Sequence, residues 1–556
     1  MDEPKHAHTT PNQLALIALA SVSMLWLAGT PFGLWPLAFF AIIPWLHLAT
    51  SPKPLTRKCY RIIWLASTAY WLIALQGLRH AHPVMYACWI ALSAYLAIYH
   101  VAFIGLTRRA IARGIPLLVA APIVWVATEL VRNYFLTGIS AAMLGHLLVD
   151  VPVMIQIADL LGSYGVGAVL VCSNVATFLT WQRWRGRSSS KSALVATSFA
   201  SALLIATISY GIYRTSEPLG ESVATIALLQ RDEEVNYVQS PERQEEIFQN
   251  YANQAVKAVR ESDQPIGLVV WPESMFSGAT PWMTAAPDAT VPAEASMTAD
   301  EFQAGVADHQ RYFTQRCRYI QQLMVAEDSQ AAPPELLAGC GVIQYADTHQ
   351  MFSGVIHVDS SGDVVDWYGK THLVLVGEHI PLVCELPWIG QMIPHLNKGE
   401  EGKRMDIAGT GVSPNICIET AVERVTVNQM RSLASTGQMP DVIATVTNDG
   451  WFDDSSVLEH HLRCAQMVAV GIRRPIVSAA NNGPTAHVDS NGKVVARLSI
   501  GTNETLITKP RRDNRNSLYV RIGDIPAWCC VLVTAFFVFR KLSTENLSVA
   551  TEKTPA

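Results

Sequence analysis

The stretch SPNICIETAVERV, Ser413–Val425, places a single thiol, Cys417, beside Glu419 and directly after an apolar run that contains Pro414. An apolar run that ends in polar residues is typical of a buried parallel strand, and the active sites of α/β domains form at the carboxyl ends of such strands. A cysteine at this place is either an inert core residue or a nucleophile. The choice depends on the compartment in which the stretch lies, and therefore on the membrane topology of the chain.

The composition predicts a membrane protein with a separate soluble part. Of the 556 residues, 50% are hydrophobic and 16% are charged, and this length exceeds one compact domain. The apolar residues concentrate in residues 1–215 and in a last run at 525–539, whereas residues 220–523 have the composition of an ordinary α/β domain. The net charge of −5 gives no indication of nucleic-acid binding, so no nucleic-acid partner is expected.

Eight segments are apolar over a length that approaches the roughly 20 residues of a spanning helix. Seven precede the soluble part and one follows it. The second contains Pro36 and Pro44, which predict a kink or a tilt. A cleaved signal peptide is the less favoured interpretation of the first, because its only nearby basic residue is Lys5 and it runs into further apolar segments. The predicted spans are 13–29, 33–50, 60–79, 84–106, 117–136, 154–181, 193–213 and 525–540.

Loop charges predict the orientation. If the amino terminus is cytoplasmic, the cytoplasmic loops 51–59, 107–116 and 182–192 all carry Lys or Arg, and the opposite loops contain none. This asymmetry follows the positive-inside rule. We therefore expect a multi-pass protein of a bacterial inner membrane, with both termini cytoplasmic and the soluble domain in the periplasm. The expected division is 1–215 with seven transmembrane helices, the domain 220–523, an eighth transmembrane helix at 525–541 and a cytoplasmic tail at 542–556.

The outer domain has an odd number of cysteines, which leaves at least one unpaired in an oxidising compartment. The sequence does not say which one is unpaired. The five cysteines are Cys317, Cys340, Cys384, Cys417 and Cys464.

Strands and helices alternate through the outer domain, which predicts a layered α/β fold. Residues 224–230, 266–274 and 441–450 are apolar runs of buried-strand type, and 241–262 has helical spacing. The segment 277–336 is expected to be a long loop or lid with one helix, at about 299–325.

Polar side chains follow several of these strands. They are Glu273, Lys370, Cys417 and the group Asn448-Asp449-Gly450-Trp451. A thiolate is a nucleophile whose pKa a nearby lysine lowers, and a carboxylate serves as general base and then as acid. The lysine also suits the oxyanion of a tetrahedral intermediate. Spacing alone does not prove that these residues converge, and each of them taken singly is more often structural.

Four motifs carry a resemblance to the nitrilase, or carbon–nitrogen hydrolase, superfamily. They are WPES with Glu273, YGKTHLVLVGEHIPL with Lys370 and Glu378, ICIE with Cys417, and NDGWF with Trp451. The Glu–Lys–Cys order is that superfamily's hallmark. With spans on both sides, the chain resembles the bacterial apolipoprotein N-acyltransferases over about 12–541. The resemblance implies an α-β-β-α sandwich outside the cytoplasm, held by about eight transmembrane helices.

The resemblance also implies a two-step acyl transfer. Cys417 attacks an acyl ester of a membrane phospholipid, and the thioester passes its acyl chain to the amine of a diacylglyceryl-cysteine apolipoprotein. Glu273 would be the base and Lys370 the oxyanion partner. The implied supporting residues are Glu378, which positions the lysine or the substrate, Glu419 behind the nucleophile, Trp451 along the acyl passage, and Asn448. No cofactor and no metal are implied.

Two points keep alternatives open. Ile418 stands where the family usually has an aromatic residue, and Asp453 where it has a glycine, so a membrane-anchored amidase or an acyltransferase for another amine is the second hypothesis. Glu129 and Arg132, three residues apart in the fifth span, are interpreted as a structural pair in preference to a lipid-headgroup anchor.

Overall fold

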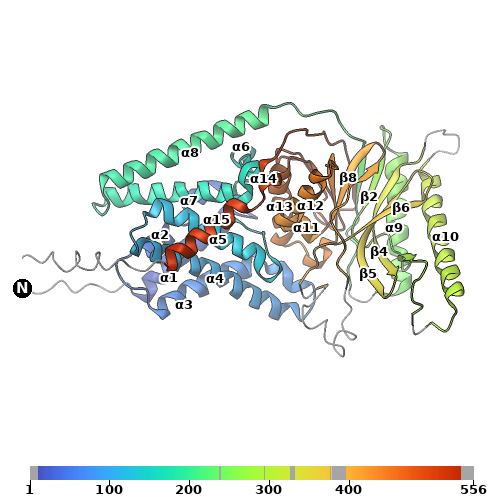
Figure 1. Cartoon of the computed structure of the whole chain (residues 1–556), viewed down its shortest axis with the longest axis horizontal. Coiled ribbons are helices and arrows are strands. Elements are labelled where there is room, and N and C mark those ends of the chain that lie inside the picture. The colour runs from blue at the N-terminus through green and yellow to red at the C-terminus, as the bar shows by residue number, and fades with distance from the viewer. Residues whose placement is uncertain are drawn as a thin grey trace, which may run out of the picture.

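The chain has a helical half and an α/β half that lie side by side (Figure 1). The computed structural model describes residues 10–236, 239–292, 295–325, 332–375, 377–378 and 396–539. The predicted tail at 542–556 lies outside these residues. The predicted class, a multi-helix membrane part joined to an α/β domain, is confirmed. The domain boundaries proposed from the sequence stay a prediction.

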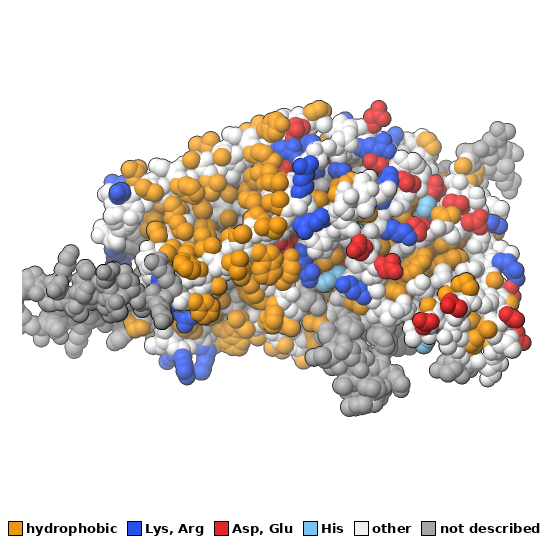
Figure 2. All heavy atoms as spheres, viewed as in Figure 1, with side chains coloured by type: hydrophobic (Ala, Val, Ile, Leu, Met, Phe, Trp, Pro, Cys, Tyr) orange, Lys and Arg blue, Asp and Glu red, His pale blue; other side chains and the backbone are white. Residues whose placement is uncertain are grey.

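Five helices are long and apolar enough to cross a membrane. They are α1 (Pro11–Ala28), α4 (Met85–Ala112), α5 (Leu117–Tyr134), α7 (Ala158–Trp184) and α8 (Ser190–Ser216). Each coincides with a predicted span. Figure 2 shows hydrophobic side chains covering this half of the molecule, while acidic and basic side chains concentrate over the α/β half. An apolar outer surface on a helical bundle is what a lipid environment requires.

The other three predicted spans are irregular or short. The segment 33–50 is broken into η1 (Trp35–Phe39) and α2 (Ile43–Thr50), with Pro36 and Pro44 each in a first turn, where proline is well tolerated. The third is α3 (Arg57–Ala74), which begins with basic residues and is followed by η2 (Gln76–His80). The last is α15 (Ile525–Phe539), with 15 described residues. The number eight therefore stays a prediction.

Two mixed sheets form the centre of the α/β half. The first has the order β13-β1-β2-β4-β5-β6, with β3 also paired to β4. Its strands are β1 (Ile226–Gln230), β2 (Leu268–Trp271), β3 (Trp282–Ala285), β4 (Glu335–Tyr345), β5 (His349–Val358), β6 (Val364–Gly369) and β13 (Glu504–Thr508). The second has the order β12-β11-β10-β9-β8-β7. Its strands are β7 (Met405–Ile407), β8 (Thr410–Ile416), β9 (Val442–Thr447), β10 (Ile476–Ala480), β11 (Ala486–Val488) and β12 (Val494–Arg497).

Helices cover the outer face of each sheet, which gives the predicted α-β-β-α sandwich (Figure 1). α9 (Pro241–Arg260) and α10 (Ala299–Met324) lie on the first sheet, and α12 (Glu423–Ser435) and α13 (Ser456–Ile472) on the second. A core of Val, Leu and Ile side chains fills the space between the sheets. Residues 277–336 contain the predicted helix, α10, and also β3, which joins the edge of β4 and which the sequence did not indicate.

The helix α13 belongs to the α/β half and packs against the helical half. Its Met467 and Val470 belong to the same buried cluster as side chains of α1, α4 and α7. Behind it, α14 (Leu518–Ile522) also contacts α7. The remaining short elements are η3 (Phe135–Thr137), η4 (Leu144–Leu148), α6 (Pro152–Ile155), α11 (Ile418–Ala421) and η5 (Asp449–Phe452).

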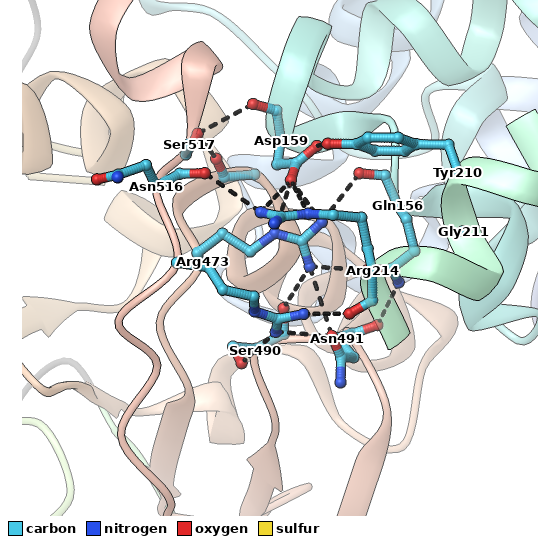
Figure 3. A network of polar contacts seen from close by, with 12 residues as sticks. Gln156, Asp159, Tyr210, Gly211, Arg214, Arg473, Ser490, Asn491, Asn516 and Ser517 are labelled. Carbon is cyan, nitrogen blue, oxygen red and sulfur yellow. Dashed lines mark hydrogen bonds and ion pairs between the residues drawn. The ribbon is translucent and has the colours of Figure 1, made fainter. Parts of the chain in front are cut away.

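A buried charge network lies at this junction (Figure 3). The carboxylate of Asp159, on α7, accepts hydrogen bonds from Arg473 at 2.7 Å and from Arg214 of α8 at 2.8 Å, and Tyr210 donates to its other oxygen. Arg473 is fully buried and donates to Gln156 as well. One carboxylate thus serves two buried guanidinium groups and links the α/β half to α7 and α8.

Asp159→Asn should therefore destabilise the whole protein. Removing one partner of a buried ion pair costs about 3–5 kcal/mol, and here Arg473, which is fully buried, would lose its carboxylate partner, while Arg214 would keep Glu217. We expect a clearly lower thermal unfolding temperature for the full chain in detergent.

The matched control is Asp363→Asn, which breaks an ion pair with Arg318 whose two side chains are each 48% exposed. Exposed pairs contribute about 0–1 kcal/mol. Equal shifts for the two variants would contradict a stabilising role for the junction network.

Candidate active site

A buried lysine joins two carboxylates at the end of the first sheet. Lys370 directly follows β6, and its Nζ donates to Glu273 Oε1 at 3.1 Å and to Glu378 Oε1 at 2.7 Å. Glu273 follows β2 and Glu378 lies in the loop after Lys370. Ser353 of β5 donates to Glu273 Oε1, and its carbonyl accepts from the Lys370 backbone N–H. The structure thus brings together three residues that the sequence placed in the site.

The charges in this cluster depend on one another. Burial disfavours the ammonium of Lys370, but the carboxylates of Glu273 and Glu378 outweigh burial and hold its pKa above the usual range. Burial raises the pKa of Glu273, and the Lys370 cation opposes that rise. A carboxylate with a raised pKa beside a fixed cation is suited to accepting and returning a proton.

Cys417 occupies a sharp turn between β8 and α11. Its backbone has φ 48° and ψ −110°, a left-handed conformation that costs a non-glycine residue on the order of 1–3 kcal/mol. Burial, together with the carboxylates of Glu273 and Asp449, raises the pKa of the Cys417 thiol, whereas Lys370 lowers it. These surroundings favour the neutral thiol, so a nearby base such as a carboxylate is needed to take its proton before the sulfur acts as a nucleophile.

Glu419 connects the two strand ends that carry Lys370 and Cys417. Its carboxylate accepts from the Tyr368 hydroxyl at 2.8 Å, from the Thr371 backbone and hydroxyl, and from the Ile416 N–H at 2.7 Å. The side chain is fully buried, and burial raises its pKa while these donors oppose the rise. Both of its oxygens are thus occupied by donors, and its supporting role behind the nucleophile stays a prediction.

The polar side chains of Asn448 and Asp449, after β9, are engaged in hydrogen bonds with neighbouring residues. Asn448 is buried, and its Oδ1 accepts from Asn481 at 3.1 Å. Asp449 accepts from the Thr447 hydroxyl at 2.8 Å and lies 3.3 Å from Nδ1 of His461. Trp451 lies half-buried on η5, and its predicted place along an acyl passage stays a prediction.

Two family models match the chain, and together they cover both halves. The amino-terminal domain of apolipoprotein N-acyltransferase matches residues 21–176, and the carbon–nitrogen hydrolase family matches 225–516. The apolipoprotein N-acyltransferase of Rhodopirellula baltica is 47% identical over 544 residues, which cover 92% of this chain and 94% of that one. The chain belongs to the apolipoprotein N-acyltransferase family.

A second relative agrees with this membership. The apolipoprotein N-acyltransferase of Geobacter metallireducens is 28% identical and covers 96% of this chain and 97% of that protein. Among solved structures, an amidase from Nesterenkonia sp. is 16% identical, with a TM-score of 0.35, over 56% of this chain and 98% of that one. The resemblance inferred from the four motifs is confirmed at the level of the family.

Some residues of the N-acyltransferase site carried no signal in the sequence. Ser353 lies in the middle of β5, where a serine is unremarkable, and Tyr368 and Thr371 gain meaning only through Glu419. His461 follows His460 in the sequence, and nothing in this pair indicates a place beside the nucleophile. The helical spacing places His461 on one face of α13, and only the fold shows that this face lies against Cys417.

The cysteines and the intramembrane charges can now be placed. All described cysteines are free thiols, and Cys317, Cys340 and Cys464 are buried, while Cys384 lies outside the described residues.

Glu129 accepts a hydrogen bond from the Leu144 N–H, and the Arg132 guanidinium lies over the Trp71 ring at 5.4 Å. Among the described residues no ion pair within 4.0 Å joins Glu129 to Arg132, and their interpretation as a structural pair stays a prediction.

Lys370→Met should slow chemical modification of Cys417. Because the Lys370 cation lowers the pKa of the thiol, its loss reduces the thiolate fraction, and each pKa unit is roughly a tenfold loss of rate at fixed pH. The measurement is the iodoacetamide rate of the Cys417 peptide of the full chain, followed by mass spectrometry.

Lys403→Met is the matched control, because it removes a lysine that pairs with Asp366 instead. A Lys370→Met rate equal to that of the control would show that the Lys370 charge does not act on the thiol.

Proposed function

We propose that the chain transfers an acyl chain from a membrane phospholipid, through a thioester on Cys417, to the amine of a diacylglyceryl-cysteine lipoprotein. The observation that supports this most directly is the buried Lys370 ammonium between Glu273 and Glu378, next to a thiol in a strained turn. Family membership supports lipoprotein N-acylation in a bacterial membrane. The phospholipid donor and the roles of individual residues are proposals.

In the first step, Glu273 removes the proton of Cys417 and the sulfur attacks the ester carbonyl of the donor. Negative charge then develops on the carbonyl oxygen, near the Lys370 ammonium, which stabilises it. The intermediate collapses by breaking the ester C–O bond. Glu273 returns the proton to the departing alkoxide, which leaves as the alcohol of a lysophospholipid, and the acyl chain stays on sulfur.

The second step repeats the chemistry with an amine. The lipoprotein amine attacks the thioester, Glu273 accepts a proton from the nitrogen, and the C–S bond breaks. The thiolate takes that proton back from Glu273, which releases the amide product and returns the enzyme to its starting state. Glu378 keeps the Lys370 ammonium in place through both steps, since its second oxygen is itself held by the Val374 N–H at 2.8 Å.

The membrane part has an energetic reason in this function. Extracting an acyl chain from a bilayer costs about 0.8 kcal/mol per methylene, so a soluble enzyme would face this cost for each chain. Contacts such as that of α13 with α7 place the α/β half against the spanning helices. The proposal puts the site at the periplasmic side of the inner membrane, because the positive-inside rule makes the basic loops cytoplasmic.

Cys417→Ala should abolish the reaction, and Glu273→Gln should slow acylation by about 10²–10⁴, the usual contribution of a general base. The full chain is placed in vesicles with isotope-labelled phospholipid and a diacylated lipopeptide. Mass spectrometry then looks for the labelled acyl group on the Cys417 peptide and on the lipopeptide amine. Cys529→Ala, at an exposed cysteine of α15, is the control that keeps activity.

The same experiment decides between acceptors. A thioester on Cys417 without acylated lipopeptide would favour the second hypothesis, an enzyme acting on a different amine, for which the branched Ile418 beside the nucleophile is the motivation. N-acylation that persists in Cys417→Ala would refute the thioester mechanism.

A further inference from the structure

The side chain of His461 lies between two hydrogen-bond acceptors. Its Nε2 is 2.9 Å from the carbonyl oxygen of Cys417, and its Nδ1 is 3.3 Å from Asp449 Oδ1. A carbonyl oxygen accepts and never donates, so Nε2 carries a hydrogen. Asp449 Oδ1 already accepts from the Thr447 hydroxyl, and a carboxylate likewise accepts, so Nδ1 carries a hydrogen too. An imidazole with hydrogens on both nitrogens is a cation.

The surroundings of the ring favour this cation. Burial alone would lower the pKa of His461, but Asp449, and to a smaller extent Glu273, outweigh burial and raise it. Cys417, whose carbonyl oxygen contacts Nε2, is a further titratable residue at the ring. The small cavity beside the ring is lined by Asp449 together with Thr420, Thr445, Ser478 and apolar side chains, so Asp449 is the charged group of that lining.

The acceptor on Nε2 is the residue whose backbone is strained. The Cys417 carbonyl accepts from His461 and from the Thr420 N–H, while the Cys417 N–H donates to Val446 O at 2.9 Å. These bonds hold both peptide groups that flank the left-handed φ. An unfavourable backbone conformation persists only where its surroundings determine it in this way.

We propose that His461 is a positioning residue for the nucleophile, held as an imidazolium that fixes the Cys417 carbonyl and neutralises the Asp449 carboxylate beside the thiol. The residue does not exchange a proton with substrate in this scheme. Asp449 disfavours the Cys417 thiolate by its charge, so pairing it with a cation makes the thiol easier to deprotonate. The proposal deepens the proposed function, on which its meaning for acyl transfer rests, but it can be tested on the thiol alone.

The test measures the iodoacetamide rate of Cys417 in the full chain, a readout that does not require any acyl transfer. His461→Ala is expected to slow this rate about tenfold, equivalent to one unit of thiol pKa. In an Asp449→Asn background, the same substitution should have a much smaller effect, because the charge to be neutralised is gone. Equal effects in both backgrounds would overturn the proposal.

Chemical rescue separates the imidazolium from a merely structural ring. At about pH 6, below the ordinary pKa of an imidazole group, added imidazole supplies two N–H donors, whereas 1-methylimidazole supplies one. We expect imidazole, and not 1-methylimidazole, to restore the alkylation rate of His461→Ala. Equal rescue by both compounds would show that two donors are not needed, and no rescue together with an unchanged unfolding temperature would refute the positioning role.

His357→Ala is the matched control for loss of a buried histidine. His357 of β5 pairs with Glu335 at 2.6 Å and has a side chain 7% exposed, but it does not contact Cys417. Its removal should leave the alkylation rate of Cys417 unchanged. Single-turnover acylation then tests the link to function. A slow thiol in His461→Ala, together with thioester formation in the wild type, would support both the positioning role and the proposed function. A wild type that alkylates normally but never forms a thioester would refute the proposed function alone.

Discussion

The site depends on the ammonium of Lys370, buried between the carboxylates of Glu273 and Glu378. A buried ammonium needs compensating charge, and two carboxylates in a low-dielectric site need a cation, so the three groups stabilise one another only as a set. Glu273 and Lys370 follow two strands of the first sheet and Glu378 lies in the next loop, so that sheet must form for the set to form. Cys417 joins it from the second sheet. The two sheets must therefore pack together for Cys417 to meet the cluster of Lys370, Glu273 and Glu378.

A second constraint acts at the membrane. α13 carries Met467 and Val470 into the core of the helical half, and on another face of the same helix His461 reaches the carbonyl of Cys417. Successive residues of an α-helix point about 100° apart, so one helix serves two partners. The Asp159 network fixes the end of this helix through Arg473. The position of the nucleophile is thus tied to the membrane helices through α13, and Glu423 of α12 adds hydrogen bonds to Ser140 and Ser163.

What the sequence could predict is local. The apolar runs with polar ends identified Glu273, Lys370 and Cys417, because strand polarity is encoded in neighbouring residues. Apolar length likewise identified α4, α5, α7 and α8. The kinked segment containing Pro36 and the basic start of α3 show where hydropathy alone does not define a span. The partners of Glu419 and His461 were beyond prediction, because they come from distant elements that only the packing of the two sheets brings together.

The desolvation of Cys417 has a consequence for timing. Thioesters release their sulfur more slowly when the parent thiol is a weak acid, because the departing thiolate is less stable. The burial that raises the pKa of the Cys417 thiol would therefore also disfavour the thiolate that has to leave when the proposed thioester gives up its acyl chain. The Lys370 cation, which lowers that pKa, would then assist the release of sulfur as well as its attack.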